Sequence, residues 1–238
     1  MKTVFLGSIF FFGTALAEWK TLDLEKFTID VPDAWEYEPV QGVDSFIGNI
    51  VGPGIKFSFD YNTQGYANPL IDTPEEYAER VSHRYSYVFQ KHDVIYTNGD
   101  VKALQEEEYR KAKANPAHKV RKVEKTIVPS RRIYKPTEKD HAKYHLADYL
   151  VDLTHNDSTV TMVILLPEVI KHHEITLDTI GNYLVKHVKP KNPGHGTTGV
   201  FYKSLSSTFT FQIHANNVPA DAHEDALKAI RSIQLKEQ

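Results

Sequence analysis

The sequence predicts an α+β fold, with a mainly antiparallel sheet flanked by helices. The first observation is the stretch Gly42–Asn62, where Ile55–Tyr61 alternates apolar and polar residues after the turn Gly52-Pro53-Gly54. The second is a pair of clearly bounded helices that begin at Thr73 and Pro219. Short connections favour antiparallel pairing, so we expect roughly six to eight strands covered by these two helices.

The N-terminal strands follow the same alternation. Phe27–Val31 predicts the first strand, and Trp35–Glu38 predicts the second after the turn at Pro32. Val43–Val51 predicts a third strand. With Ile55–Tyr61 they form a predicted four-stranded antiparallel meander.

The helix predicted from Thr73 to Phe89 has a defined start. Thr73 stands at the N-cap, Pro74 at the first helical position and Glu76 at the third, which is a capping box. The buried stripe of this helix is predicted to consist of Tyr77, Val81, Tyr85 and Val88.

The segment Val101–Ala114 predicts a second, solvated helix, rich in Glu, Lys and Ala. Glu107 and Lys111 have the spacing of an ion pair on one helix face. The apolar contact candidates are Val101, Leu104 and Tyr109. The adjacent carboxylates of Glu106–Glu108 are expected in solvent, where nothing raises a pKa for acid catalysis.

The second half of the chain predicts more strands. His118–Tyr134 is expected to be extended and broken at Pro129. Tyr144–Thr154 and Thr159–Leu166 predict a hairpin. Met162–Leu166 is apolar on both faces, which predicts a central strand.

The C-terminal part holds one ambiguity. Ile175–Val188 fits either a helix or a strand, and Lys189–Gly199 is expected to be a loop. Phe209–Ile213 predicts the last strand. The helix from Pro219 has acidic residues in its first turns and basic residues near its end, as the helix dipole favours. Its predicted buried stripe is Ala222, Ala226, Leu227, Ile230 and Ile233.

Composition and the N-terminus indicate the compartment. The 238 residues are 41% hydrophobic, and a net charge of −3 gives no support for nucleic-acid binding. Met1–Ala17 has the charged, apolar and small-residue regions of a signal peptide, which predicts export to the periplasm or medium. Residues 18–238 are expected to form one domain without stable membrane insertion. The absence of cysteine rules out disulfides and a lipoprotein anchor.

Two stretches carry a family resemblance. Phe27–Trp35, a strand followed by Pro-x-x-Trp, and Phe209–Ile213 with its closing helix resemble PsbP-like domains, which are α-β-α sandwiches. Gly42–Gly48 and Gly194–Gly199 are similar to segments of exported proteins from Bacteroidetes-type bacteria. The resemblance covers both ends of the mature chain, and implies a binding or assembly module.

The histidines and glycines suggest two kinds of site. His141 and His145 could lie on one side of their segment, but no third ligand stands at metal-site spacing, so no metal is predicted. Gly194–Gly199, with His195, Thr197 and Thr198, fits either an anion-binding loop or a tight hairpin turn.

Three residues of the central hairpin are ligand-binding candidates. Asp44, Asp60 and Tyr61 are expected on its exposed face, where they either contact a ligand or satisfy backbone groups at strand ends. No Gly-x-Ser-x-Gly motif is present, so no catalytic residue is assigned.

The sequence therefore predicts an exported, non-catalytic binding or envelope-assembly module without a cofactor. Its partner would be a small molecule or an envelope protein. The alternative is a metal-dependent or other hydrolase that uses histidines near His141 and His195. A homo-oligomeric structural protein is a third possibility.

Overall fold

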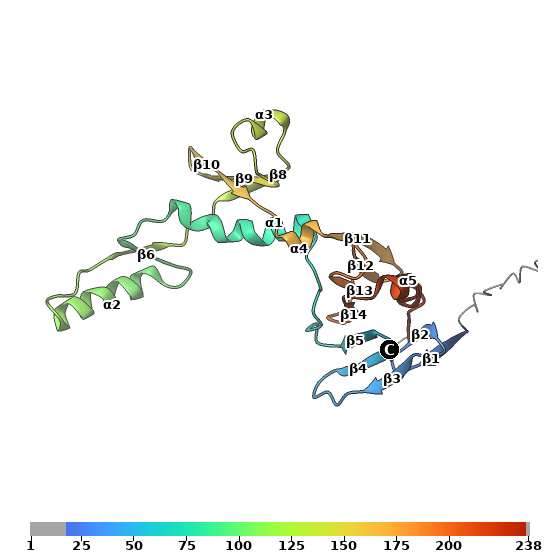
Figure 1. The fold of residues 1–238 in the computed structure, drawn as a ribbon. Coiled ribbons are helices and arrows are strands. Elements are labelled where there is room, and N and C mark those ends of the chain that lie inside the picture. The colour runs from blue at the N-terminus through green and yellow to red at the C-terminus, as the bar shows by residue number, and fades with distance from the viewer. Residues whose placement is uncertain (1–17, 237–238) are drawn as a thin grey trace, which may run out of the picture. The chain divides into compact units, whose positions relative to one another are not determined.

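The computed structural model describes residues 18–236, so the predicted signal peptide Met1–Ala17 lies outside the described residues. Within them the α+β class is confirmed, with mostly antiparallel sheets and a few helices (Figure 1). The chain divides into two compact units, residues 1–70 with 172–238 and residues 71–171. The single domain expected from the sequence stays a prediction, and each unit is described by itself.

The first unit contains an antiparallel sheet of seven strands in the order β11-β12-β13-β14-β5-β4-β3. This number agrees with the predicted size of the sheet. The central hairpin is confirmed, with Pro53 and Gly54 in the turn between β4 and β5. The strands are β3 (Glu36–Pro39), β4 (Phe46–Gly52), β5 (Ile55–Asn62), β11 (His173–Ile180), β12 (Tyr183–Pro190), β13 (Thr197–Ser204) and β14 (Thr210–Asn216).

One face of this sheet carries an aromatic core. Phe57, Phe59 and Phe211 point to the same side because alternate strand residues share a face. Phe27 packs on this side, with its ring centroid 5.1 Å from that of Phe59 and 4.9 Å from that of Phe211. Helix α5 (His223–Arg231), which follows the 3-10 turn η2 (Ala220–Ala222), contributes Ala226, Ala229 and Ile230 to the same core.

The strand that carries Phe27 does not belong to the predicted meander. It is β2 (Phe27–Pro32), and it pairs with β1 (Trp19–Asp23) and β15 (Gln234–Leu235) in a separate three-stranded sheet. The prediction was wrong because a short connection does not require pairing. The buried face of β2 packs onto the aromatic core, while β1 pairs with one edge of β2 and β15 pairs with the other. The meander therefore consists of β3, β4 and β5.

The indole ring of Trp35 lies so close to the backbone at position 52 that this position requires a glycine. A Cβ atom on Gly52 would collide with the indole ring of Trp35. Trp35 is buried and its ring lies 5.8 Å from that of Phe57. Gly52 thus allows Trp35 to close this end of the core.

The ambiguous segment Ile175–Val188 forms strands. β11 and β12 form a hairpin whose turn contains Gly181 at φ 57°. The expected loop Lys189–Gly199 is shorter than predicted, because β12 continues to Pro190 and β13 begins at Thr197. The strand expected over Phe209–Ile213 is β14, and β15 follows α5 as a further short strand.

The second unit has its own hydrophobic cluster. Helix α1 (Pro74–Ser82) starts with the predicted Thr73–Glu76 capping box and continues into a 3-10 segment, η1 (His83–Phe89). The helix packs against a three-stranded sheet of its own unit, which corrects the expectation that it covers the main sheet. The sheet consists of β8 (Ser130–Tyr134), β9 (Tyr149–His155) and β10 (Ser158–Ile164), and two short helices are α3 (Glu138–His141) and α4 (Glu168–Lys171).

The central strand of this sheet is β9, not the strand that contains Met162. Leu150 and Val151 are adjacent and both fully buried, so β9 is covered on both faces. β10 lies at an edge, where Leu165, just beyond its end, is exposed. The apolar run Met162–Leu166 therefore did not indicate a central position.

The predicted helix Val101–Ala114 is confirmed as α2, with Asp100 as its N-cap. It packs against β7 (Lys122–Lys125), which pairs in parallel with β6 (Val94–Thr97). The buried side of α2 was not predicted: Glu108 is 3% exposed, whereas Tyr109 is 59% exposed. Across residues 18–236, no helix is both long enough and apolar enough to cross a bilayer.

Candidate ligand-binding cleft

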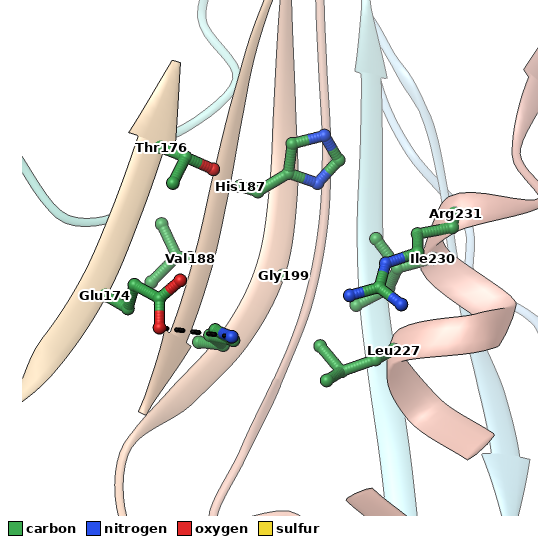
Figure 2. A pocket seen from close by; sticks show the side chains of 9 residues that line it. Glu174, Thr176, His187, Val188, Gly199, Leu227, Ile230 and Arg231 are labelled. Atoms are coloured by element: carbon green, nitrogen blue, oxygen red, sulfur yellow. Dashed lines mark ion pairs between the residues drawn. The ribbon is translucent and has the colours of Figure 1, made fainter. Parts of the chain in front are cut away.

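A cleft of about 200 Å³ lies between α5 and the strands β11, β12 and β13 (Figure 2). We call it the α5 cleft. Both polar and apolar groups line it. The lining residues are Glu174, Thr176, His187, Val188, Lys189, Gly199, Leu227, Ile230 and Arg231.

Strand register brings the polar groups of the cleft together. Glu174 pairs with Lys189, and Thr176 pairs with His187, across the antiparallel β11–β12 ladder. These four side chains point to the side of the sheet that α5 covers, since they alternate with residues of the other face. Two adjacent strands thus form a polar floor.

Helix periodicity supplies the opposite wall. Leu227 and Arg231 are four residues apart and lie on the same side of α5. Burial of Ala226 and Ile230 in the core fixes the rotation of the helix, which leaves Leu227 and Arg231 directed toward the strands (Figure 2).

The charges in the cleft are only partly balanced. The Lys189 Nζ lies 3.1 Å from a Glu174 carboxylate oxygen, an ion pair drawn as a dashed line in Figure 2. Among residues 18–236, no carboxylate lies within ion-pair distance of the Arg231 guanidinium. Burial lowers the pKa of His187, and the nearby charge of Arg231 lowers it further, while Asp178 opposes this shift. The Arg231 side of the cleft is therefore cationic.

Two buried polar atoms of residues that neighbour the cleft lining in sequence have no hydrogen-bond partner among residues 18–236. They are Thr198 Oγ1 and His223 Nδ1, in side chains that are 0% and 5% exposed. Thr198 precedes Gly199 and faces α5, because Val200 on the same face belongs to the core. His223 lies one helical turn before Leu227. A buried polar atom left unpaired costs about 1–3 kcal/mol, and an ordered water is one partner that offsets this cost.

The Gly194–Gly199 segment forms the turn and first residues of the β12–β13 hairpin. The Thr197 amide donates to His173 Nε2 at 2.9 Å, and the Gly196 amide donates to Asn217 Oδ1 at 2.9 Å. A Cβ atom on Gly196, whose φ is 105°, would collide with the His173 ring. His195 is exposed. These amides are used within the protein, which agrees with the hairpin-turn interpretation. None of the predicted ligand-binding residues lines the cleft, although Thr198 directly precedes the lining residue Gly199.

The structure separates the three candidates of the central hairpin. Tyr61 is buried in the aromatic core, 4.6 Å from the ring of Phe209, so its predicted place on an exposed face is wrong. Adjacent strand residues face opposite sides, and Asp60 is therefore on the other face. Burial raises the pKa of Asp60, a hydrogen bond from Ser45 lowers it, and the negative charge of Asp44 raises it.

The predicted histidine pair does not form a metal site with other residues of the described chain. His141 ends α3, and both His141 and His145 are exposed. Within residues 18–236, no three His, Asp or Glu side chains are placed to hold a metal ion.

Most residues that line the cleft were not predicted from the sequence. His187 and Glu174 lie in or beside the segment whose secondary structure was ambiguous, so their common face was not apparent. Arg231 was interpreted only as a charge that complements the helix dipole. The available signal was its spacing from Leu227, which places a cation at the margin of the buried stripe.

Comparison with known proteins adds no assignment. No family model matches the chain, and no curated protein matches it at a significant level.

Proposed function

We propose that this protein is an exported, non-catalytic binding module that holds a small polar molecule in the α5 cleft. The observation that carries the proposal is the Arg231 guanidinium, which is directed into the cleft and has no carboxylate partner among the described residues. The arginine offers up to five N–H donors in a fixed plane. The Leu227 and Ile230 side chains supply the apolar contact typical of a ligand pocket.

The arrangement favours binding over catalysis. A nucleophilic hydroxyl needs a base within hydrogen-bond reach. The Thr176 hydroxyl and the His187 ring are neighbours across two strands, but no hydrogen bond joins these two described side chains. The cleft contains groups that orient a ligand rather than a paired nucleophile and base.

The same proposal includes a PsbP-like fold and export to the periplasm or medium. An antiparallel sheet with a C-terminal helix on one face supplies the sheet and one helical layer of a PsbP-like α-β-α sandwich. Export is inferred from the signal-peptide pattern of Met1–Ala17. A small-molecule receptor of the periplasm or medium fits these properties, and an envelope protein is the other partner class.

A screen by ligand-observed NMR tests the proposal. The mature protein would be screened against small polar metabolites, and hits would be mapped by amide shifts. We expect shifts at Val188, Gly199 and Leu227. The Leu227→Trp variant fills the cleft and should abolish binding, whereas Leu205→Trp, at an exposed position in the same unit, should retain it. Hits that map elsewhere and survive Leu227→Trp would contradict the proposal.

The hydrolase alternative has its own test. Metal analysis of the purified protein and of its His141→Ala, His145→Ala and His195→Ala variants would measure metal content. Stoichiometric metal that is lost in these variants would favour the hydrolase over the binding module.

A further inference from the structure

We infer that the ligand of the α5 cleft is a small organic carboxylate, and that Arg231 binds its carboxylate group. The inference rests on the proposed binding function and names the ligand class. It is carried by the charge of the cleft, its size and its apolar wall.

Among residues 18–236, Arg231 has no carboxylate within ion-pair distance, which it shares with Arg84, Arg110 and Arg132 but not with Arg80 or Arg131. Arg80 pairs with Asp72, and Arg131 lies 3.7 Å from Glu79. The guanidinium of Arg231 instead projects from α5 toward β12 and β13 (Figure 2). A guanidinium is always charged near neutral pH, and its parallel N–H groups match the two oxygens of a carboxylate.

The volume of the cleft and the Glu174–Lys189 ion pair restrict which anions we expect to bind. The cleft volume of about 200 Å³ is below the roughly 300–1,000 Å³ that is typical of pockets for drug-sized ligands, so we expect a small ligand. The Glu174 carboxylate repels a dianion such as phosphate more strongly than a monoanion, and its ion pair with Lys189 reduces this repulsion. Leu227 and Ile230 provide contact for a short hydrocarbon portion. These features together favour a monocarboxylate over a phosphate ester.

His187 makes binding depend on pH. The charged groups around it are Arg231 on α5, Asp178 and Glu174 on β11, and Lys189 on its own strand. The Arg231 charge disfavours protonation of His187, and a bound carboxylate would offset that charge. Protonated His187 in turn attracts the anion. Affinity for a carboxylate should therefore increase as the pH falls from about 8 to about 5.5.

Calorimetric titration with matched acid and amide pairs tests the inference. The probes are propionate with propionamide and lactate with lactamide, at about pH 6 and constant ionic strength. We expect the acids to bind at least about tenfold more tightly than the amides, because only the acids form charge-assisted hydrogen bonds with Arg231. Arg231→Met should weaken acid binding by about tenfold to hundredfold.

A control on the same helix separates local contact from net charge. Lys228 lies over the Trp19 ring, 3.6 Å from its centroid, and does not line the α5 cleft. Lys228→Met removes the same unit of charge and should leave acid binding within about twofold. Arg231→Lys should restore part of the affinity, which distinguishes an anion contact from a packing role.

The outcomes separate the two proposals. If amides bind as well as acids, or Arg231→Met retains acid binding that Leu227→Trp abolishes, the carboxylate inference is overturned and the binding function stands. If no small molecule of any class shifts the cleft amides, both proposals fail. A thermal midpoint of Arg231→Met equal to that of the parent protein would show that lost binding is not lost folding.

Discussion

The two units of this protein are stabilised in different ways. In the first unit, Phe27, Phe57 and Phe211 are fully buried in one aromatic cluster beneath α5. In the second unit, a smaller cluster surrounds β9, and α2 is held partly by the polar contacts of Glu108. Burial of large apolar side chains is insensitive to pH, whereas a buried carboxylate is not.

This difference bears on where a ligand site can be maintained. Of the elements that line the α5 cleft, α5, β12 and β13 contribute residues to the core of the first unit, so their lining side chains start from fixed backbone positions, whereas β11 is the edge strand of the sheet. Sites on rigid elements hold their geometry better than sites on loops. The charged surface of α2 offers no comparable support.

The largest expected effect is in the aromatic core. Phe27→Ala should lower the free energy of unfolding of the first unit by about 3–5 kcal/mol, because it removes a buried ring that contacts Phe59 and Phe211. Both tryptophans, Trp19 and Trp35, belong to this unit, so denaturation followed by tryptophan fluorescence measures it.

The control is Val43→Ala at a fully exposed position, which should change the free energy by less than about 0.5 kcal/mol. A loss below about 1 kcal/mol in Phe27→Ala would contradict the importance of the aromatic cluster.

A second substitution sharpens the comparison between the units. Leu153→Ala removes a fully buried side chain of β9 and should destabilise the second unit by about 2–5 kcal/mol. Each hydrophobic cluster contains residues of one unit, so we expect the tryptophan transition to stay in place while circular dichroism detects an earlier one. Coincident transitions would instead support the single domain predicted from the sequence.

The third prediction concerns the charge contacts of α2. Burial raises the pKa of Glu108, but hydrogen bonds with His118 and Lys111 outweigh it and hold the pKa below its usual range. The ionised carboxylate therefore stabilises the fold above the ordinary glutamate range, and this contribution is lost as the pH falls through the lowered pKa. At neutral pH, Glu108→Gln should speed the hydrogen exchange of α2 amides. The further increase in exchange that low pH causes in the parent protein should be smaller in this variant.

Glu107→Gln is the matched control for this measurement. Its carboxylate is more exposed and pairs with Lys111 at 3.0 Å, so its loss should change exchange little. Equal effects of the two variants would show that the buried position of Glu108 has no special role.

The smallest expected effect is at Asp60. Its raised pKa means that the folded state retains a proton to higher pH than the unfolded chain, so stability falls as the pH rises through the folded-state pKa. At neutral pH, Asp60→Asn should stabilise the first unit by less than about 1 kcal/mol, since the buried Asp60 Oδ1 has no hydrogen-bond partner in the described part of the chain. Asp44→Asn, which relieves only the charge repulsion, should stabilise it less. If Asp60→Asn instead destabilised the first unit, the Asp60 carboxylate would stabilise the folded state, which contradicts this prediction.

Local patterns determined the individual elements. The alternation in Ile55–Tyr61 was sufficient to predict β5 and its buried face, and the Thr73–Glu76 capping box was sufficient to predict the start of α1. The bounds of α2 were likewise predicted from the turn residues that flank Val101–Ala114. Periodicity and capping depend on neighbours within a few residues, so the sequence contains them directly.

Tertiary structure alone decided which elements meet. β2 pairs with β1 and β15 rather than with β3, and Glu108 is buried because His118 and β7 return to α2. The α5 cleft joins Glu174 and His187, on paired strands, to Arg231 on a helix after two further strands. Pairing partners and clefts depend on contacts between distant segments, and a period along one segment specifies a face but not the surface that covers it.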